Sequence, residues 1–270
     1  MPKLTSETYA ELYERFNAPV AARHDCGRYC APLNGGTPVC CDPGHAIPIV
    51  AREEWRLLKA RTDLWRRFKP FDAVSEDIVH SLDTSCIAVE CRGAAFCEGP
   101  IRSLACRTFP FVPYITRDGR VVGVSIYWTF RDRCWIQSRL DAVDPAFVAE
   151  MLATYETVFQ ADPDERVPFV EQSASMRRVF SRWREPIPVL TADGAFLKVR
   201  PKSGGALEPA SVSDFAAHGP FVSKAAYRKA ARALGASAKA VRGVLPQAFD
   251  EPGKSPVAPK LPRPERVKNV

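Results

Sequence analysis

The chain has no apolar run that approaches the length of a membrane span, which needs about 20 residues. Its amino terminus, MPKLTSETYAELYERF, carries polar and charged residues throughout and lacks the apolar core of a secretory signal. These two absences argue against a membrane protein. We therefore expect a cytoplasmic protein without a membrane partner.

Common cofactor and hydrolase motifs are missing as well. The sequence contains no Gly-rich dinucleotide loop, no P-loop, no HExxH and no GxSxG, and it shows no internal repeat. These absences argue against a common nucleotide-cofactor fold. Its 270 residues are 46% hydrophobic and 26% charged, which is sufficient for a sizeable core.

Cysteine is what the sequence does have, with nine residues of this type. Cytosolic thiols are kept reduced, and an odd number cannot pair completely, so clustered cysteines indicate metal ligands or redox groups. Eight of them fall into two blocks of four, and one stands alone. The first block is Cys26, Cys30, Cys40 and Cys41, the second is Cys86, Cys91, Cys97 and Cys106, and the ninth is Cys134.

Four thiolates complete a tetrahedral zinc site or anchor an iron–sulfur cluster, so the count fits one site or two. Zinc and iron both stay open, because all-sulfur ligation suits both. The adjacent Cys40 and Cys41 share one ion only if the backbone bends sharply, so they serve different metals or one is a bystander. Gly35 and Gly36 permit such bending. The isolated Cys134 is equally typical of a small buried hydrophobe.

The segment CIAVECRGAAFCEGPIRSLACRTFPF resembles the second half of the YkgJ-like cysteine-cluster family, a zinc- or iron-chelating domain. The matching positions are Cys97, Arg102, Cys106, Arg107, Phe109 and Pro110. The first half of the family pattern is also similar to this chain, where the Cys-Cys pair is followed by a short apolar stretch and an acidic helix. The resemblance covers about residues 20–140. The chain departs from the family in a longer loop between Cys30 and Cys40, in Ser103 where a proline is usual, and in Cys91.

The resemblance implies a zinc or iron site, a 4Fe-4S cluster included, on the two cysteine blocks, with Cys91 and Cys134 as further ligands. We also expect Arg102 and Arg107 beside the cofactor, where positive charge lowers thiol pKa values and offsets thiolate charge. Surface salt bridges are the alternative for both arginines. His24 and His45 flank the first block and are candidate nitrogen donors.

Two functional hypotheses follow. The first is a metal-binding protein whose cluster is structural, a role that suits zinc, and whose body binds a protein partner. The alternative is an iron-dependent or Fe–S protein-modifying enzyme, since a related cysteine pattern occurs in the lysine N-methylase of flagellin. The formal net charge of +7 has much of its excess beyond residue 205. Few aromatics accompany it, so we expect no nucleic-acid partner.

The pattern of apolar residues predicts an α+β fold: a cysteine-rich metal-binding domain with short helices and β-hairpins, then a helical extension and a flexible basic tail. Helices are predicted at 6–16, 51–68, 144–160 and 168–184, a short strand at 46–50, and hairpins around Asp118-Gly119 and Asp193-Gly194. The predicted domains are an amino-terminal helix at 1–17, the cysteine-cluster domain at 18–142, a helical and β-hairpin extension at 143–205, a basic helical segment at 206–249 and a disordered Pro-rich tail at 250–270.

Overall fold

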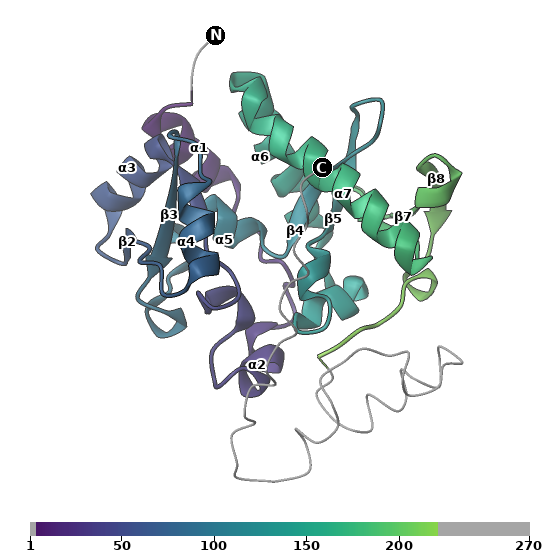
Figure 1. Cartoon of the computed structure of the whole chain (residues 1–270), viewed down its shortest axis with the longest axis horizontal. Helices are drawn as coiled ribbons and strands as arrows, with labels where there is room; N and C mark the ends of the chain where they lie inside the picture. Colours follow the sequence, from purple (N-terminus) through teal and green to yellow (C-terminus); the bar gives the residue numbers. More distant parts are fainter. Residues whose placement is uncertain (1–3, 221–270) are drawn as a thin grey trace.

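The computed structural model describes residues 4–220, and these form an α+β fold with two antiparallel sheets (Figure 1). The first sheet has the order β1-β3-β2, from β1 (Ile49–Ala51), β2 (Trp65–Arg67) and β3 (Cys86–Cys91). The second has the order β4-β5-β6-β7-β8, from β4 (Phe111–Ile115), β5 (Val121–Ile126), β6 (Ile187–Leu190), β7 (Phe196–Arg200) and β8 (Ala206–Ala210). The predicted α+β class is confirmed.

Helices cover the two sheets separately. Figure 1 shows α1, α3 and α4 around the three-stranded sheet, whereas α6 and α7 accompany the five-stranded sheet. The helices are α1 (Ser6–Arg15), α2 (Gly27–Cys30), α3 (Arg52–Arg61), α4 (Ala73–His80), α5 (Leu104–Thr108), α6 (Pro145–Ala161) and α7 (Val167–Trp183). Within residues 4–220, no helix has the length and apolar character that crossing a membrane requires.

The longer helices begin where local signals place them. Thr5 and Thr8 form a capping box at the start of α1. The Asp144 side chain accepts a hydrogen bond from the Ala146 N–H, and Pro145 occupies the first position of α6, as predicted. The predictions of α1, α6 and α7 are therefore confirmed, with ends that differ by one or two residues.

The predicted helix at 51–68 is too long. Helix α3 ends at Arg61, Thr62 is extended, and β2 then pairs antiparallel with β3. The Trp65 side chain is only 2% exposed, and its indole N–H donates to the Ile101 carbonyl at 2.8 Å. Burial of this side chain against β3 outweighs the helix propensity of the segment, which is a weak local preference.

Both predicted hairpins form, and they belong to one sheet because Val124 in β5 pairs with Leu190 in β6. The domain boundary predicted between residues 142 and 143 consequently runs through a single sheet. Residues 206–210 form strand β8, where the start of a basic helical segment was expected. The remainder of that segment from residue 221, and the tail predicted at 250–270, lie outside the described residues.

A shared core holds these elements together. The Phe147 ring of α6 packs against Phe16, which follows α1, with ring centroids 5.6 Å apart, and against Phe111 of β4 at 5.8 Å. All three side chains are at most 1% exposed. The amino-terminal helix, the second sheet and α6 therefore pack as one unit, which leaves the cysteine turns at the periphery.

The turn between β6 and β7 packs tightly against the start of α6, which yields a stability prediction. Gly194 has φ 81°, and an added Cβ would lie 3.1 Å from the Pro145 side chain. We expect Gly194→Ala to lower the free energy of unfolding by about 2–3 kcal/mol, because a left-handed conformation and a steric contact act together. Gly204, with φ 71° and open space around it, is the control. Gly204→Ala should cost only about 1 kcal/mol in urea unfolding, and equal losses would contradict the packing.

Candidate metal centre

The first cysteine block folds into short turns. Cys26 precedes α2 and Cys30 ends it, while Cys40 and Cys41 lie on a 3₁₀ turn (Val39–Cys41). The loop between Cys30 and Cys40 bends at Gly35 (φ 62°) and Gly36 (φ 88°), as expected from the sequence. The Cys40 and Cys41 Sγ atoms lie 3.8 Å apart. This geometry presents two adjacent thiols without a disulfide between them.

The second block spans β3, two 3₁₀ turns and α5. Cys86 and Cys91 lie at opposite ends of β3, and a strand of this length separates its end residues by about 16 Å. The Cys91 Sγ accepts the Gly93 N–H at 3.4 Å. Cys97 follows the 3₁₀ turn Ala94–Phe96. Cys106 lies in the first turn of α5.

Cys91 and Cys106 of the second block both have Cys41 and Cys97 among the groups that act on them. Burial, and then the nearby thiols Cys41, Cys91 and Cys97, raise the pKa of Cys106 to about 12. Burial also raises the pKa of Cys91, with Cys41 and Cys97 contributing. We call these four, Cys41, Cys91, Cys97 and Cys106, the Cys106 group.

The other first-block thiols are neighbours of Cys134. Burial, and then Cys30, raise the pKa of Cys26 to about 11. Burial raises the pKa of Cys134 strongly, and Cys26 and Cys30 add to the effect. The hydrogen bond with Cys41, burial and the nearby Cys41 raise the pKa of Cys40, and Cys134 and Cys26 contribute too. Cys41 also acts on Cys30 and Cys40, so the two sets of thiols adjoin there; we call Cys26, Cys30, Cys40 and Cys134 the Cys26 group.

Cys86 belongs to neither group. Its Sγ lies 3.7 Å from the Ser85 hydroxyl, and burial raises its pKa, with Ser85, Glu165 and Asp83 as the other groups that act on it. No cysteine is among them. The sequence spacing suggested a shared site with Cys91, but an extended strand carries the two thiols to opposite ends, which a turn or helix of the same length would not do.

The two candidate arginines have different surroundings. The Arg102 Nε lies 3.1 Å from the Cys97 Sγ. Burial lowers the Arg102 pKa, but the hydrogen bond to Cys97 and the nearby thiols outweigh it and raise the pKa overall. Arg107 instead lies over the Tyr13 ring at 4.5 Å and donates to the carbonyls of Pro100 at 2.9 Å and Phe16. Arg102 therefore meets the thiols, whereas Arg107 fastens α5 to the end of α1.

The flanking histidines are held by other partners. The His45 ring nitrogens lie 2.9 Å from the Asn34 Oδ1 and 3.3 Å from an Arg133 nitrogen. The His24 Nδ1 lies 3.4 Å from the Tyr29 hydroxyl. Both imidazoles are thus engaged with other side chains.

Glu54 is a residue of the site that the sequence reasoning missed. Its carboxylate accepts the Tyr13 hydroxyl and the Leu104 N–H, both at 2.6 Å, and it is 3% exposed. Burial raises the Glu54 pKa to about 7. The Glu54 carboxylate thereby joins α1 and α3 to Leu104 at the start of α5. Leu104 lies two residues before Cys106. Glu54 shares a helix face with Leu57 and Leu58 at i+3 and i+4, and this spacing was the signal for its burial.

No closed coordination shell is present among residues 4–220: no three His, Cys, Asp or Glu side chains are grouped so that they could hold a metal ion. The two thiol groups supply the ligand chemistry, because four sulfurs suit zinc or iron. The two thiol groups do not, however, have the geometry of a completed metal coordination shell. A metal would have to draw the thiols of each group closer together.

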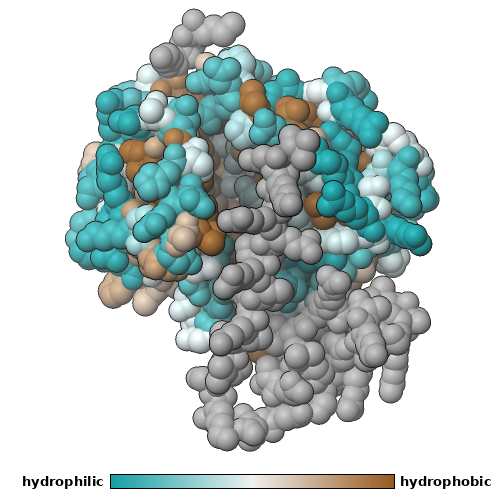
Figure 2. Space-filling model, viewed as in Figure 1, coloured by the Kyte–Doolittle hydropathy of each residue, from teal (hydrophilic) through white to brown (hydrophobic). Residues whose placement is uncertain are grey.

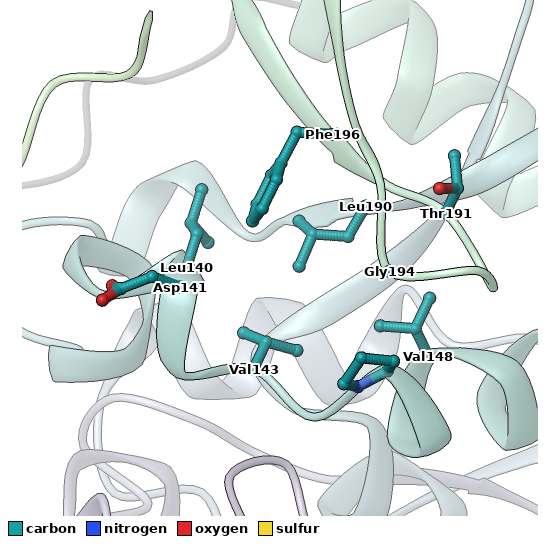
Figure 3. A pocket seen from close by; sticks show the side chains of 9 residues that line it. Leu140, Asp141, Val143, Val148, Leu190, Thr191, Gly194 and Phe196 are labelled. Carbon is teal, nitrogen blue, oxygen red and sulfur yellow. The ribbon is translucent and has the colours of Figure 1, made fainter. Parts of the chain in front are cut away.

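A small hollow elsewhere offers no comparable chemistry. It has a volume of about 170 Å³ and lies between the start of α6 and the β6–β7 hairpin (Figure 3). Leu140, Val143 and Leu190 give it an apolar lining. The Asp141 carboxylate at its edge pairs with Arg139 at 2.9 Å and points away from the hollow in Figure 3. The cysteine groups therefore remain the candidate site.

Comparison with known proteins adds no relative: no family model, no curated protein and no solved structure matches this chain. The resemblance to the YkgJ-like family accordingly stays a prediction, and function has to be argued from the arrangement of the thiols.

Proposed function

We propose that this protein binds zinc or iron through two separate sets of four cysteine thiolates, the Cys26 group and the Cys106 group. The proposal is supported by the thiols that act on one another: Cys41 and Cys97 act on both Cys91 and Cys106, and Cys26 and Cys30 act on Cys134. Each set contains the four sulfurs that complete a tetrahedral zinc or anchor one iron–sulfur cluster. In this proposal the adjacent Cys40 and Cys41, whose Sγ atoms lie 3.8 Å apart, belong to different sets, so the two neighbouring residues need not bind one ion.

Packing alone is a poor account of these thiols. Of the eight, only Cys30 and Cys134 are buried, and the other six are partly exposed. Cys40, Cys41 and Cys97 lie on or directly after 3₁₀ turns, near glycines with positive φ such as Gly36 and Gly93. Free cysteines that serve as small hydrophobes are usually among the most buried residues. Partly exposed, reduced thiols on turns are typical of metal ligands.

Binding is expected to order the turns and release protons. Burial keeps the pKa values of Cys26 and Cys106 high, so both are thiols near neutral pH and must lose a proton to a metal. The Arg102 guanidinium beside Cys97 supplies positive charge that offsets thiolate charge. The metal's proposed role is structural, since it fastens peripheral turns to the body of the protein.

Differential alkylation tests this proposal. The reduced protein is labelled without oxygen, with or without added zinc or ferrous ion, and the modified cysteines are mapped by mass spectrometry. We expect metal to protect the partly exposed thiols of both groups, among them Cys26 and Cys97, with protection complete at about two equivalents of zinc. Cys86 serves as the internal control and should react equally fast in both samples. Labelling rates that do not change with metal at any cysteine would rule the proposal out.

A further inference from the structure

A second, more polar hollow lies where the end of α7 meets β7 and the turn after it. Its volume is about 270 Å³. Strongly hydrophilic side chains cover this side of the molecule in Figure 2, where Figure 1 places β7 and β8. Four cationic residues line the hollow: Arg184, Lys198, Arg200 and Lys202. It lies on the five-stranded sheet and includes no cysteine.

The carboxylates of the hollow are already paired. The Asp214 carboxylate forms an ion pair with the Lys198 Nζ at 3.0 Å. Glu185 pairs with Arg131, with 2.6 Å between the guanidinium nitrogen and the carboxylate oxygen. Negative charge within the hollow is thus neutralised by specific partners.

Two of the four cations have no such partner among residues 4–220. Arg200 pairs with Glu208 at 2.7 Å, but no carboxylate of residues 4–220 lies within ion-pair distance of Arg184 or Lys202. The hydroxyls of Ser181 and Ser203, which also line the hollow, are further hydrogen-bond donors. The hollow therefore keeps an excess of about two positive charges beside neutral donors.

The backbone conformation of Arg184 is a second, independent indication that the hollow is a ligand site. Among the described residues, Arg184 is the one non-glycine residue with positive φ, at 60°, and it ends α7. Glycine or asparagine usually occupies this left-handed position, because a Cβ there costs about 1 kcal/mol or more. Strained residues of this kind cluster at ligand sites. Here the strain places an arginine on the rim of the hollow.

We propose that this hollow binds the phosphate group of a small phosphate monoester. A phosphate monoester carries about two negative charges at neutral pH, which matches the excess positive charge. A guanidinium can meet two phosphate oxygens at once through its planar fork of N–H donors, and an ammonium adds a point charge. A volume of about 270 Å³ lies near the lower end of ligand pockets, so a small molecule fits better than a polymer.

Calorimetric titration of the full chain at low ionic strength tests the site, with inorganic phosphate and glycerol 2-phosphate as probes. We expect saturable 1:1 binding that weakens at least about tenfold in Arg184→Gly, because a charge-assisted hydrogen-bond donor is lost. Glycine suits the left-handed conformation, so this variant should melt no lower than the wild type. Arg182→Ala removes a nearby arginine that does not line the hollow, and it should bind as the wild type does.

The two probes also distinguish the source of the phosphate. Tighter binding of glycerol 2-phosphate supports a monoester ligand, whereas tighter or equal binding of inorganic phosphate overturns the monoester assignment. Absence of saturable binding for both probes overturns the site itself. So does equal affinity in the wild type and Arg184→Gly, or an equal loss in Arg182→Ala. None of these results bears on metal binding, which rests on other residues.

Discussion

Cys106→Ser is expected to remove about half of the bound metal and to lower the melting temperature clearly. Serine keeps a similar volume but is a poor ligand for zinc or iron, so the Cys106 group loses its fourth sulfur. The Cys26 group keeps its four thiols and its metal. Structural metal supplies a large part of the folding free energy of small metal-binding modules, so the melting temperature should fall with metal content.

Two further serine variants make this prediction specific. Cys134→Ser should also remove about half of the metal, because Cys134 belongs to the Cys26 group. Cys86→Ser is the matched control on β3 and should retain the wild-type metal content. If either Cys106→Ser or Cys134→Ser releases all of the metal, a single shared site replaces the two sites proposed above. Wild-type metal content in both variants would contradict the assignment of ligands.

Stability is expected to fall as pH rises from about 4 to about 7 because of Glu54. Burial raises the pKa of this carboxyl to about 7, above its unfolded value of about 4.3. Between these two values the folded state binds the proton more tightly than the unfolded state does. The contribution of this carboxyl to the free energy of unfolding is fully present below about pH 4 and is lost as pH rises to about 7, by up to about 4 kcal/mol.

Glu54→Gln should remove this dependence on pH. The amide oxygen can still accept the Tyr13 hydroxyl and the Leu104 N–H, but the side chain no longer ionises. Urea unfolding from pH 5 to 8 should therefore show the variant gaining stability relative to the wild type as pH rises. Glu76→Gln, at an exposed position of α4, should keep the wild-type slope. Parallel curves for Glu54→Gln and the wild type would exclude Glu54 as the source.

The sequence predicted those elements whose signals are local. Asp144 with Pro145 marks the start of α6, and Asp-Gly pairs mark both hairpins of the second sheet. Strands β2 and β8 were missed because their pairing partners determine them. Trp65 lies in a segment that favours a helix, but this segment pairs with β3 as a strand. Residues 206–210 likewise form a strand because they pair with β7. Contacts between distant residues of this kind leave no periodic pattern in the segment itself.

The candidate site shows the same division. The cysteine turns and the proximity of Arg102 to a thiol follow from motif and composition, but the partition of the thiols does not. Cys86 is separated from Cys91 because the intervening segment is extended, and Cys134 joins the first block from a distant turn. Glu54 shares a helix face with Leu57 and Leu58, but Tyr13 and Leu104, which hold its carboxylate, lie on other helices and leave no signal in the α3 segment.

The most direct test is a metal analysis with an ultraviolet–visible spectrum of the protein purified without oxygen. We expect zinc or iron in an amount that fills two sites per chain. A colourless sample with zinc would identify two structural zinc sites, and broad absorption near ~400 nm with iron would identify iron–sulfur clusters. A folded protein that contains neither zinc nor iron, and takes up neither when reduced and supplied with it, would contradict the account.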